Sequence, residues 1–417
     1  MTFACGIDFG TSNSSVGVSD AKGARLLPIQ RGATSVPTAL FFDFDDHSTT
    51  FGHDALDRFV THEPGRYLRA IKSVLGARLF EEKTQVGRRR YGFGDIIAAF
   101  LHFLRAAAGE NLGAPPTSVV LGRPAFFVDD DPDADARAQR QLETAARAAG
   151  FENIAFQFEP IAAALDYEQS VNAEEIALVA DIGGGTSDFS VVRVSPERAR
   201  SSDRRQDILG FTGVHIGGTD FDRLLAMASV MPALGLRSPL LRKGLDAPSW
   251  YFSDLATWHR INFLYEQKVL SQVRGVLRDS AEPEKIERLL RVLEQRKGHE
   301  LLAGVEAAKI ALSHSDLAIL DLKDTIPGIF LKIARTELEA AVADRLERIR
   351  SRIADVLGMA GLTENSVSAV FLTGGATRMP SVRASIAAAV PTARLIAGDA
   401  FGSVATGLAL DAARRFA

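Results

Sequence analysis

The chain has 417 residues, enough for two or more domains with complete hydrophobic cores. Its 46% apolar and 24% charged residues are ordinary for a globular protein, and the net charge of −4 excludes a general attraction to nucleic acid or to an anionic membrane. Cys5 is the only cysteine, which excludes a disulfide scaffold and a cysteine metal site and indicates a reducing cytoplasm. We expect Cys5 to be a core residue. We expect no signal peptide and no membrane-spanning segment.

The first thirty residues predict a β-hairpin with a polar turn. An apolar strand over residues 3–7 leads into Asp8-Phe9-Gly10-Thr11-Ser12-Asn13-Ser14-Ser15, and a second strand begins at Val16. An aspartate closes the first strand, and glycine and hydroxyl residues make the turn, as in a phosphate-binding hairpin. The stretch is not a Walker A loop, since no Gly-Lys-Ser/Thr follows, nor a Rossmann fingerprint, which needs a strand followed by a helix.

Residues 36–112 predict a mixture of strands and helices. A buried strand is expected over 37–42, helical structure over 52–80 with a break at Pro64-Gly65, and an amphipathic helix over 94–108. Arg88-Arg89-Arg90 has acidic residues on either side in the sequence. We interpret this cluster as a solvated loop and not as a nucleic-acid patch.

The next segment predicts a strand over 118–122, a helix to about Ala149 and a strand near Ile154. The acidic run over 129–133 resembles a calcium loop, but the positions that need glycine and glutamate hold Ala134 and Arg140. We therefore expect these acids to lie at the N-terminus of the helix. A further helix should begin at Glu159, with a proline in its first turn.

The stretch Asp181-Ile182-Gly183-Gly184-Gly185-Thr186-Ser187-Asp188 lies between two apolar runs and predicts a second hairpin. We expect the glycines to adopt turn conformations closed to other residues and to leave backbone N–H groups uncovered for an anion. The two aspartates would hold a hydrated cation, and the Thr186 hydroxyl would contact a phosphate. An ordinary glycine-rich hairpin is the alternative. Two such hairpins about 170 residues apart predict a duplicated domain that closes on one nucleotide.

The remaining chain alternates strands and helices, which predicts an α/β architecture. We expect a polar turn over 201–207, a helix beginning near Asp220 and almost wholly helical structure to residue 315. Residues 284–297 predict a solvated amphipathic helix. Strands over 317–333, a long helix over 335–357, a strand over 370–373 and a final helix from about Gly402 complete the prediction.

The helix around residue 308 carries a polar arc. At about 100° per residue, Glu306, Lys309 and Ser313 fall within roughly 60° of one another, beside an apolar stripe of Leu301, Val305, Ala308 and Leu312. The pattern leaves two interpretations open. One is a polar ligand site, and the other is an exposed Glu–Lys pair of little energetic weight.

With these pieces in place, the sequence resembles the actin-like ATPase superfamily and, within it, the DnaK-type heat shock protein 70 chaperones. Motifs in family order span nearly all of the chain: the phosphate loops Asp8–Ser15 and Asp181–Asp188, the hinge helix Glu159–Leu165, the proline switch Arg123–Phe127, the turn Gly217–Asp222, the Glu306/Lys309/Ser313 helix and the adenosine motif Gly374–Pro380. Lys72 lies four residues before Gly76, as the family's catalytic lysine does.

The resemblance implies an α/β actin-like ATPase fold of the ribonuclease H-like type, with two lobes of duplicated βββαβα units and inserted subdomains. Lobe I would span residues 1–176, with an insert at about 36–112. Lobe II would span residues 177–417, with a helical insert at about 219–316.

The resemblance also implies roles for individual residues of this sequence. Lys72, Glu159, Asp181 and Thr186 would be catalytic: Lys72 stabilises charge on the transferring phosphoryl group, and Glu159 and Asp181 orient the attacking water. Asp8, Asp181 and Asp188 would hold Mg²⁺, mostly through water, with K⁺ nearby. The residues expected to bind ATP or ADP are Gly10, Thr11, Ser12, Asn13, Gly183, Gly184, Gly185, Thr186, Gly217, Gly218, Glu306, Lys309, Ser313, Gly374, Gly375 and Arg378.

Three departures from the family pattern stand out. Ile310 replaces an arginine that often stacks on adenine, which is expected to alter nucleotide affinity. The last motif, near Asp399, aligns with an offset of one or two residues, so Asp399 receives no role. The chain stops at Ala417, after the expected last helix of the ATPase. It is therefore similar to the short, YegD-like branch of putative chaperones without a peptide-binding domain.

The expected protein is a slow, cytoplasmic, monomeric chaperone-type ATPase that acts on client proteins or with co-chaperones, without nucleic acid or membrane. Lobe closure around ATP would be its signal. Alternatives are a nucleotide-dependent regulator with little turnover, a sugar-kinase-type phosphotransferase on the same fold and a filament-forming actin relative. Lys72 and the hinge motif argue against the sugar kinase. The sequence does not identify the client or partner.

Overall fold

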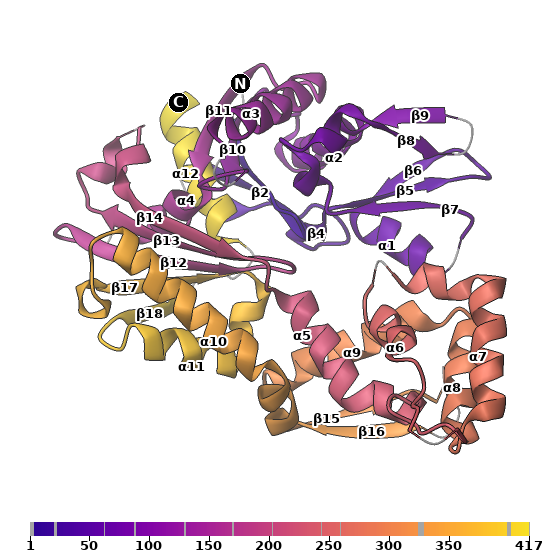
Figure 1. Cartoon of the computed structure of the whole chain (residues 1–417). Helices are drawn as coiled ribbons and strands as arrows, with labels where there is room; N and C mark the ends of the chain where they lie inside the picture. Colours follow the sequence, from indigo (N-terminus) through magenta and orange to yellow (C-terminus); the bar gives the residue numbers. More distant parts are fainter. Residues whose placement is uncertain are drawn as a thin grey trace. The chain divides into compact units, whose positions relative to one another are not determined.

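The computed structural model describes residues 4–20, 23–61, 63–86, 89–128, 131–168, 171–201, 203–242, 244–258, 260–323, 329–397 and 402–416. The chain divides into two compact units. Unit 1 consists of Met1–His215, Arg350–Thr377 and Ile386–Ala417, and unit 2 of Ile216–Ile349 and Arg378–Ser385. Figure 1 shows the helices and strands of the chain, coloured along the sequence.

The first sheet of unit 1 has the strand order β11-β10-β1-β2-β3, with β4 also paired to β2. Strands β1 to β3 are antiparallel, whereas β10 and β11 extend the sheet in parallel from β1. The strands are β1 (Ala4–Phe9), β2 (Asn13–Asp20), β3 (Gly23–Leu26), β4 (Ser35–Pro37), β10 (Ser118–Arg123) and β11 (Asn153–Phe158).

The second sheet repeats this topology. Its order is β14-β13-β12-β17-β18, again with three antiparallel strands followed by two parallel ones. The strands are β12 (Glu175–Ile182), β13 (Ser187–Val194), β14 (Ile208–Val214), β17 (Ala369–Thr373) and β18 (Arg394–Ala397). The shared order and orientation confirm the duplicated α/β unit that the two hairpins predict.

Helices cover both faces of the first sheet. Val119 and Leu121 of β10 belong to a core with α2 (Phe93–Leu112) and α3 (Pro132–Ala148). Val120, whose side chain points to the opposite face, belongs to a second core with α4 (Glu159–Glu168) and α12 (Ser403–Phe416). Coverage of both faces explains the unbroken apolar runs of the central strands.

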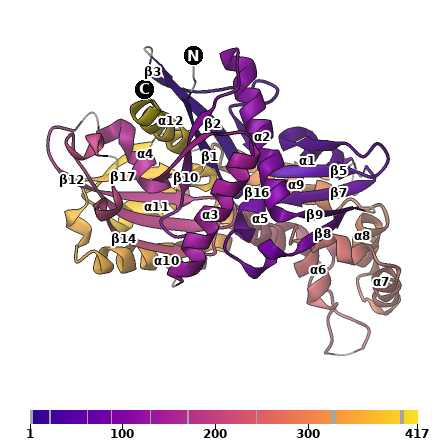
Figure 2. The same ribbon diagram turned by 90° about the horizontal axis from the view of Figure 1, so that it is seen from above.

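Helix α12 follows β18 of the second sheet in the chain. It nevertheless packs on the first sheet. It packs on β1, β2 and α4 (Figure 2). The packing is close: a Cβ added at Gly6 would lie 2.3 Å from the Ala409 nitrogen, and one added at Gly407 would lie 1.8 Å from the Ala162 oxygen. Helix α4 in turn contacts β12, β13 and β17. The two helices therefore share one core with both sheets.

An insert between β4 and α2 carries small sheets of its own. The three-stranded sheet has the order β6-β5-β7, and β8 pairs with β9. Its elements are β5 (Ala39–Asp43), β6 (Thr49–Phe51), α1 (Gly52–Val60), β7 (Gly65–Arg69), η1 (Ile71–Val74), η2 (Arg78–Glu81), β8 (Lys83–Val86) and β9 (Arg89–Gly92).

Unit 2 is mostly helical, as predicted, and includes one β-hairpin. Its elements are α5 (Gly218–Leu225), the π-helical turn η5 (Ala226–Val230), η6 (Met231–Leu234), α6 (Ser249–Leu255), η7 (Ile261–Tyr265), α7 (Gln267–Asp279), α8 (Pro283–Glu294), α9 (Gly298–Leu312), β15 (Leu317–Asp321) and β16 (Phe330–Ala334). Helices α10 (Arg335–Met359) and α11 (Pro380–Ala389) contribute residues to both units.

Several sequence expectations need correction. Residues 52–80 are helical only in α1 and two short 3₁₀ turns, because β7 pairs with β5 after the break at Pro64. Arg89 and Arg90 are exposed but lie on β9 and not in a loop; Arg88 lies outside the described residues. Asp131 caps α3 through the Ala134 N–H as predicted. Cys5 is buried, as predicted.

The expected polar turn over 201–207 is in part a buried ionic cluster. The Arg204 and Glu168 side chains are fully buried and form a bidentate pair, with N–O distances of 2.7 and 2.8 Å. Arg204 also donates to Asp207, and the Ser195 N–H donates to Glu168 at 2.9 Å. The cluster ties the β13–β14 connection to the end of α4.

No helix within the described ranges is long and apolar enough to cross a membrane.

Candidate active site

The polar turns predicted at the two hairpins lie next to each other in unit 1. In the first hairpin Asp8 is opposite Ser15, and in the second Asp181 is opposite Asp188. A Cβ added at Gly184 would lie 2.3 Å from the Ser12 hydroxyl oxygen. The two hairpins therefore bring their turns and aspartates to one place.

The reason for the three glycines differs from the prediction. None of Gly183, Gly184 and Gly185 has a positive φ, so the turn does not require a conformation closed to other residues. Gly184 is needed for space beside Ser12, whereas Gly185 has open space around its Cβ position. The second turn is closed by a hydrogen bond from the Gly183 N–H to the Thr186 carbonyl at 2.9 Å.

The first turn is anchored by Thr38, a residue that the sequence analysis did not single out. Its N–H donates to the Ser12 carbonyl at 2.9 Å, and its hydroxyl donates to the Gly10 carbonyl at 2.7 Å. The Ser14 and Thr38 hydroxyls also share a hydrogen bond of 2.8 Å. Thr38 follows β4, which pairs with β2, so its position depends on strand pairing that no motif encodes.

Lys72 forms an ion pair with Glu159, with 2.6 Å between Nζ and Oε1. The two residues come from different segments: Lys72 lies on the 3₁₀ turn η1 after the β5–β7 sheet, and Glu159 is the first residue of α4. Ala70, two residues before Lys72, has a left-handed conformation with a φ of 54°. For a non-glycine residue this conformation is strained.

Helix α3 holds the segment that follows Lys72. The Gly76 N–H donates to the Gln141 side chain at 2.8 Å. Gly76 has a φ of 76°, and an added Cβ would lie 2.7 Å from Val128. Only glycine fits this turn, and the turn fixes the direction from which Lys72 reaches Glu159.

The three aspartates of this cluster, Asp8, Asp181 and Asp188, have raised pKa values. Burial, together with repulsion from Glu159, raises the pKa of Asp8 to about 8 and that of Asp181 to about 6. Burial and the charge of Asp181 raise the pKa of Asp188 to about 7. Burial by itself lowers the pKa of Lys72, but Glu159 and Asp8 outweigh it and the net shift is upward. Lys72 therefore remains an ammonium.

This cluster fits a divalent cation held through water. Four carboxylates interact with a single ammonium, and the directly opposed Asp181 and Asp188 repel each other when both are ionised. A hydrated Mg²⁺ would relieve that repulsion. Within the described residues no three acidic, histidine or cysteine side chains are placed to ligate one ion together.

A small cavity of about 30 Å³ is lined by Glu159, Asp181, Asp188 and Thr373 together with apolar residues such as Val179 and Phe211. The buried Thr373 side chain lies beside the Asp181 carboxylate, where its hydroxyl favours the ionised form of Asp181. A space of this size holds one water molecule, and Thr373 and the carboxylates supply the partners that such a water needs. The cavity therefore fits a single water held between Glu159 and Asp181.

The pKa shifts predict that the stability of the nucleotide-free protein falls as the pH rises from 5 to 9. Folded Asp8, Asp181 and Asp188 retain protons that the unfolded chain has released, so this stability is present at low pH and is lost as each folded pKa is passed. Thermal unfolding measured from pH 5 to pH 9 should show this decrease of stability with pH. Added MgADP should stabilise the protein more at pH 8.5 than at pH 5.5. The triple variant Asp8→Asn, Asp181→Asn, Asp188→Asn is the control. An unchanged slope in it would contradict the assignment.

Gly374, the first residue of the predicted adenosine motif, packs against the end of β12. Its φ is 80°, and an added Cβ would lie 2.3 Å from the Ile182 carbonyl oxygen and 2.6 Å from Asp181 Oδ1. This glycine is therefore in direct contact with the carboxylate that the sequence assigns to the metal and to catalysis.

Gly374→Ala is expected to weaken MgATP binding about tenfold or more, because the methyl group displaces Asp181 and the backbone cannot relax at a positive φ. Gly358→Ala is the matched control, since Gly358 lies in α10 with open space at its Cβ position. Titration calorimetry of both variants measures the difference. Equal affinities would show that Gly374 does not position Asp181.

Unit 2 holds six of the predicted nucleotide residues, namely Gly217, Gly218, Glu306, Lys309, Ser313 and Arg378. The Lys309 ammonium is buried and pairs with Asp222 Oδ1 at 2.8 Å, and it donates to the Gly218 carbonyl at 3.2 Å. The alternative of an exposed Glu306–Lys309 pair is therefore wrong, because the packing of α5 on α9 gives Lys309 a different acid. The predicted apolar stripe, Leu301, Val305, Ala308 and Leu312, is buried.

Of the remaining predicted residues, Gly375 belongs to unit 1 and the others belong to unit 2. Glu306 is exposed on α9, and the Ser313 hydroxyl donates to the Lys309 carbonyl at 3.4 Å. The Gly217 N–H donates to Asp220 at 2.9 Å at the start of α5. Gly375 and Arg378 begin and end the 3₁₀ turn η9. Asp399 lies outside the described residues.

Comparison with known proteins agrees with this arrangement. The profile of the family described as Hsp70 protein matches residues 4–230 and 282–413. The chain belongs to the Hsp70 protein family. It is also 26% identical over 379 residues to the chaperone protein DnaK of Mycoplasmopsis synoviae (strain 53), an alignment that covers 91% of this chain and 53% of that protein. The chain thus spans about half the length of this curated relative.

Membership of the Hsp70 family confirms the predicted actin-like ATPase fold, to which the two sheets of equal topology correspond. The matched ranges include both hairpins, Lys72, Glu159 and Gly374. Residues 231–281, which include α6, lie outside the match.

Proposed function

We propose that this Hsp70 family protein binds ATP with Mg²⁺ and hydrolyses it slowly, as a chaperone-type ATPase in the cytoplasm. The observation that carries the proposal is the cluster in unit 1 where the Lys72 ammonium lies 2.6 Å from Glu159 among carboxylates of raised pKa, beside two adjoining glycine turns. Family membership supports the same activity.

Each part of the cluster has a proposed role. Asp8, Asp181 and Asp188 hold Mg²⁺ through water, and the ion offsets the charge of the phosphates and orients them. The backbone N–H groups of the two turns and the Thr186 hydroxyl bind phosphate oxygens. Lys72 stabilises the charge that develops on the transferring phosphoryl group, and Glu159 and Asp181 orient the water that attacks it.

The proposal extends to the predicted nucleoside residues. Glu306, Lys309, Ser313, Gly375 and Arg378 are proposed to contact the nucleoside, with K⁺ near the phosphates. Lys309 is already paired with Asp222, so it offers a donor held in a fixed position. Ile310, which is 54% exposed on α9, offers an apolar surface to the base.

The finer organisation is proposed from the resemblance. Residues 1–176 and 177–417 would act as the two lobes of the ATPase, and closure of the lobes would signal the nucleotide state to client proteins or co-chaperones. The protein is proposed to act as a monomer, without nucleic acid or membrane. Family membership does not favour a sugar kinase or a regulator without turnover.

The decisive experiment combines calorimetric titration with MgATP and measurement of phosphate release under single-turnover conditions. We expect saturable binding that requires Mg²⁺ and slow release of phosphate from bound ATP. Binding without any release would assign the protein to the regulators. No binding would reject the proposal. Transfer of phosphate to added hexoses would support the sugar kinase.

A further inference from the structure

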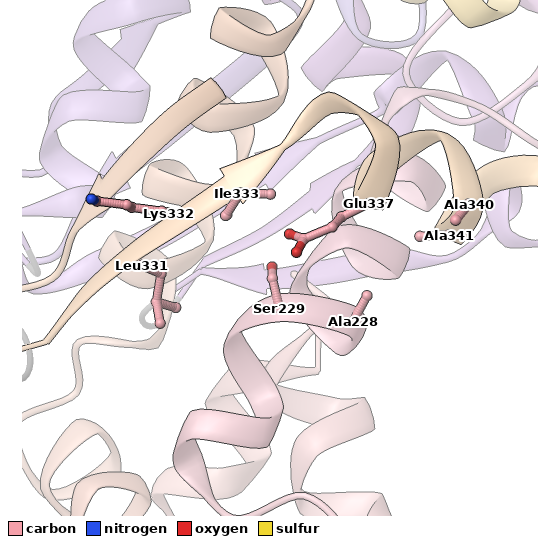
Figure 3. A pocket seen from close by; sticks show the side chains of 8 residues that line it. All are labelled: Ala228, Ser229, Leu331, Lys332, Ile333, Glu337, Ala340 and Ala341. Carbon is pink, nitrogen blue, oxygen red and sulfur yellow. The ribbon is translucent and has the colours of Figure 1, made fainter. Parts of the chain in front are cut away.

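The strand β16 of unit 2 borders a groove of about 460 Å³. Three consecutive β16 residues, 331–333, form one side, and η5 and the first turns of α10 form the other (Figure 3). The helical side is made mostly of small residues, Ala228, Ala340 and Ala341. Side chains of successive strand residues point to opposite faces of a sheet. Because all three consecutive residues line the groove, the groove runs along the edge of β16 and not over one of its faces.

Among the residues that the structure describes, β15 is the only strand paired with β16, and the hydrogen-bond pattern shows which groups of β16 face away from it. β15 and β16 form a two-stranded antiparallel sheet in which Leu320 is opposite Leu331 and Ala318 is opposite Ile333. Backbone bonds from Leu322 N to Ile329 O and from Arg335 N to Asp316 O extend the ladder in the same register. Bonded and non-bonded pairs alternate in such a ladder. Residues 329, 331, 333 and 335 therefore bond to β15.

The backbone groups of Phe330, Lys332 and Ala334 consequently point to the free edge. The Ala334 N–H is bonded by the Glu337 carboxylate at 3.3 Å. For the N–H and C=O of Lys332, in the middle of the strand, the described part of the chain provides no hydrogen-bond partner. An extended polypeptide segment can hydrogen-bond to both the N–H and the C=O of Lys332, as a neighbouring strand does in a sheet.

Side chains add a charge preference to this edge. Lys332 is exposed, and no acidic group of the described residues lies within ion-pair distance of it. Figure 3 shows its side chain pointing away from Glu337 and Ser229, whose polar ends point toward each other. Ile319 lies opposite Lys332 on β15, and Leu317, Ile319 and Phe330 are 49%, 64% and 59% exposed. This outer face therefore combines apolar residues with Asp321, which is paired with Lys323, and with Lys332, for which no ion pair is found among the described residues.

We propose that the groove takes up an extended segment of a partner protein, which adds to β16 as a third strand. Because side chains alternate across a strand, alternate residues of the segment face the alanine wall and are apolar. The residue opposite Lys332 lies on the outer face and is acidic, since a cross-strand pair of opposite charge is favourable. A lysine on an edge strand also discourages pairing with a second copy of the chain, whose own Lys332 would repel it.

The test uses the whole chain and two fluorescein-labelled seven-residue peptides, one alternating valine with glutamate and one alternating valine with lysine. Fluorescence anisotropy should show saturable binding of the acidic peptide, at least about tenfold tighter than that of the basic one. Hydrogen exchange of the segment 329–335, followed by mass spectrometry, should slow when the acidic peptide is bound, because strand addition covers the Lys332 amide.

The matched variants differ at one position. Lys332→Pro removes the outward N–H without removing a ladder bond, as a proline does at a sheet edge. Lys332→Thr removes the same charge but keeps the N–H. We expect the proline variant to bind at least about tenfold more weakly than the threonine variant, with equal thermal stability and equal MgATP affinity.

Four results would overturn the proposal. Equal affinities of the proline and threonine variants would show that the main chain is not recognised. Unchanged exchange of residues 329–335, or absence of saturable binding of either peptide, would show that no strand is added. Concentration-dependent self-association that the proline variant abolishes would assign this edge to a second copy of the chain.

Discussion

Replacement of Lys72 by alanine is expected to reduce ATP turnover at least about 100-fold, the usual cost of removing one donor that stabilises developing charge. ATP affinity should change little, because Lys72 is paired with Glu159 in the free protein and the glycine turns supply the donors that hold the phosphates. Single-turnover phosphate release and calorimetry with MgATP separate the two effects.

The matched control is Lys83→Ala, since Lys83 is an exposed lysine on the nearby strand β8. Loss of Lys72 also leaves Glu159 without its ammonium in a cluster of like charges. The double variant Lys72→Met, Glu159→Gln should therefore regain stability without regaining turnover. Turnover in Lys72→Ala equal to that of the Lys83 control would remove Lys72 from the catalytic role.

Replacement of Arg204 by leucine is expected to lower the free energy of unfolding by about 3–5 kcal/mol, because it leaves the buried Glu168 carboxylate without its cation, while Asp207 keeps its pair with Arg198. The loss should appear as a lower denaturant concentration at the midpoint of unfolding. The dependence of the unfolding free energy on denaturant concentration should not change. It should leave MgATP affinity intact, since the cluster lies at the end of α4 opposite to Glu159.

Arg200→Leu is the control, because Arg200 is exposed on the same connection and should change stability by less than about 0.5 kcal/mol. The double variant Arg204→Leu, Glu168→Leu should recover part of the loss, as expected when both members of a buried pair become apolar. Equal losses in Arg204→Leu and Arg200→Leu would mean that the buried cluster contributes no specific stability.

The features that the sequence predicted correctly are local ones. Turn residues between apolar runs are enough to place both hairpins, and the 3.6-residue period is enough to place α2, α8 and α9. The main error in secondary structure is β7, where a short strand exists because β5 lies beside it. A segment of five residues has only a weak strand pattern of its own, so pairing with a neighbouring strand decides whether it forms a strand.

The candidate site shows the same division. Lys72 and Glu159 were singled out separately, but they are 87 residues apart, and the turn at Gly76 and its bond to Gln141 bring them together. The glycine turn was predicted, yet the need for Gly184 comes from Ser12 in the other hairpin. Asp222 lies in a motif that the sequence singled out, but its pairing with Lys309 was not predicted, and Thr38, which anchors the first turn, was not singled out.

The sequence by itself determined the duplicated hairpins, the order of the motifs and thus the family, because turn chemistry and hydrophobic period act over a few neighbouring residues. Only the tertiary structure decided which charge each buried cation pairs with, which glycine is needed for space and which strand edge remains free. These depend on the packing of distant segments, where burial makes each unpaired charge costly and each added methyl group a steric conflict.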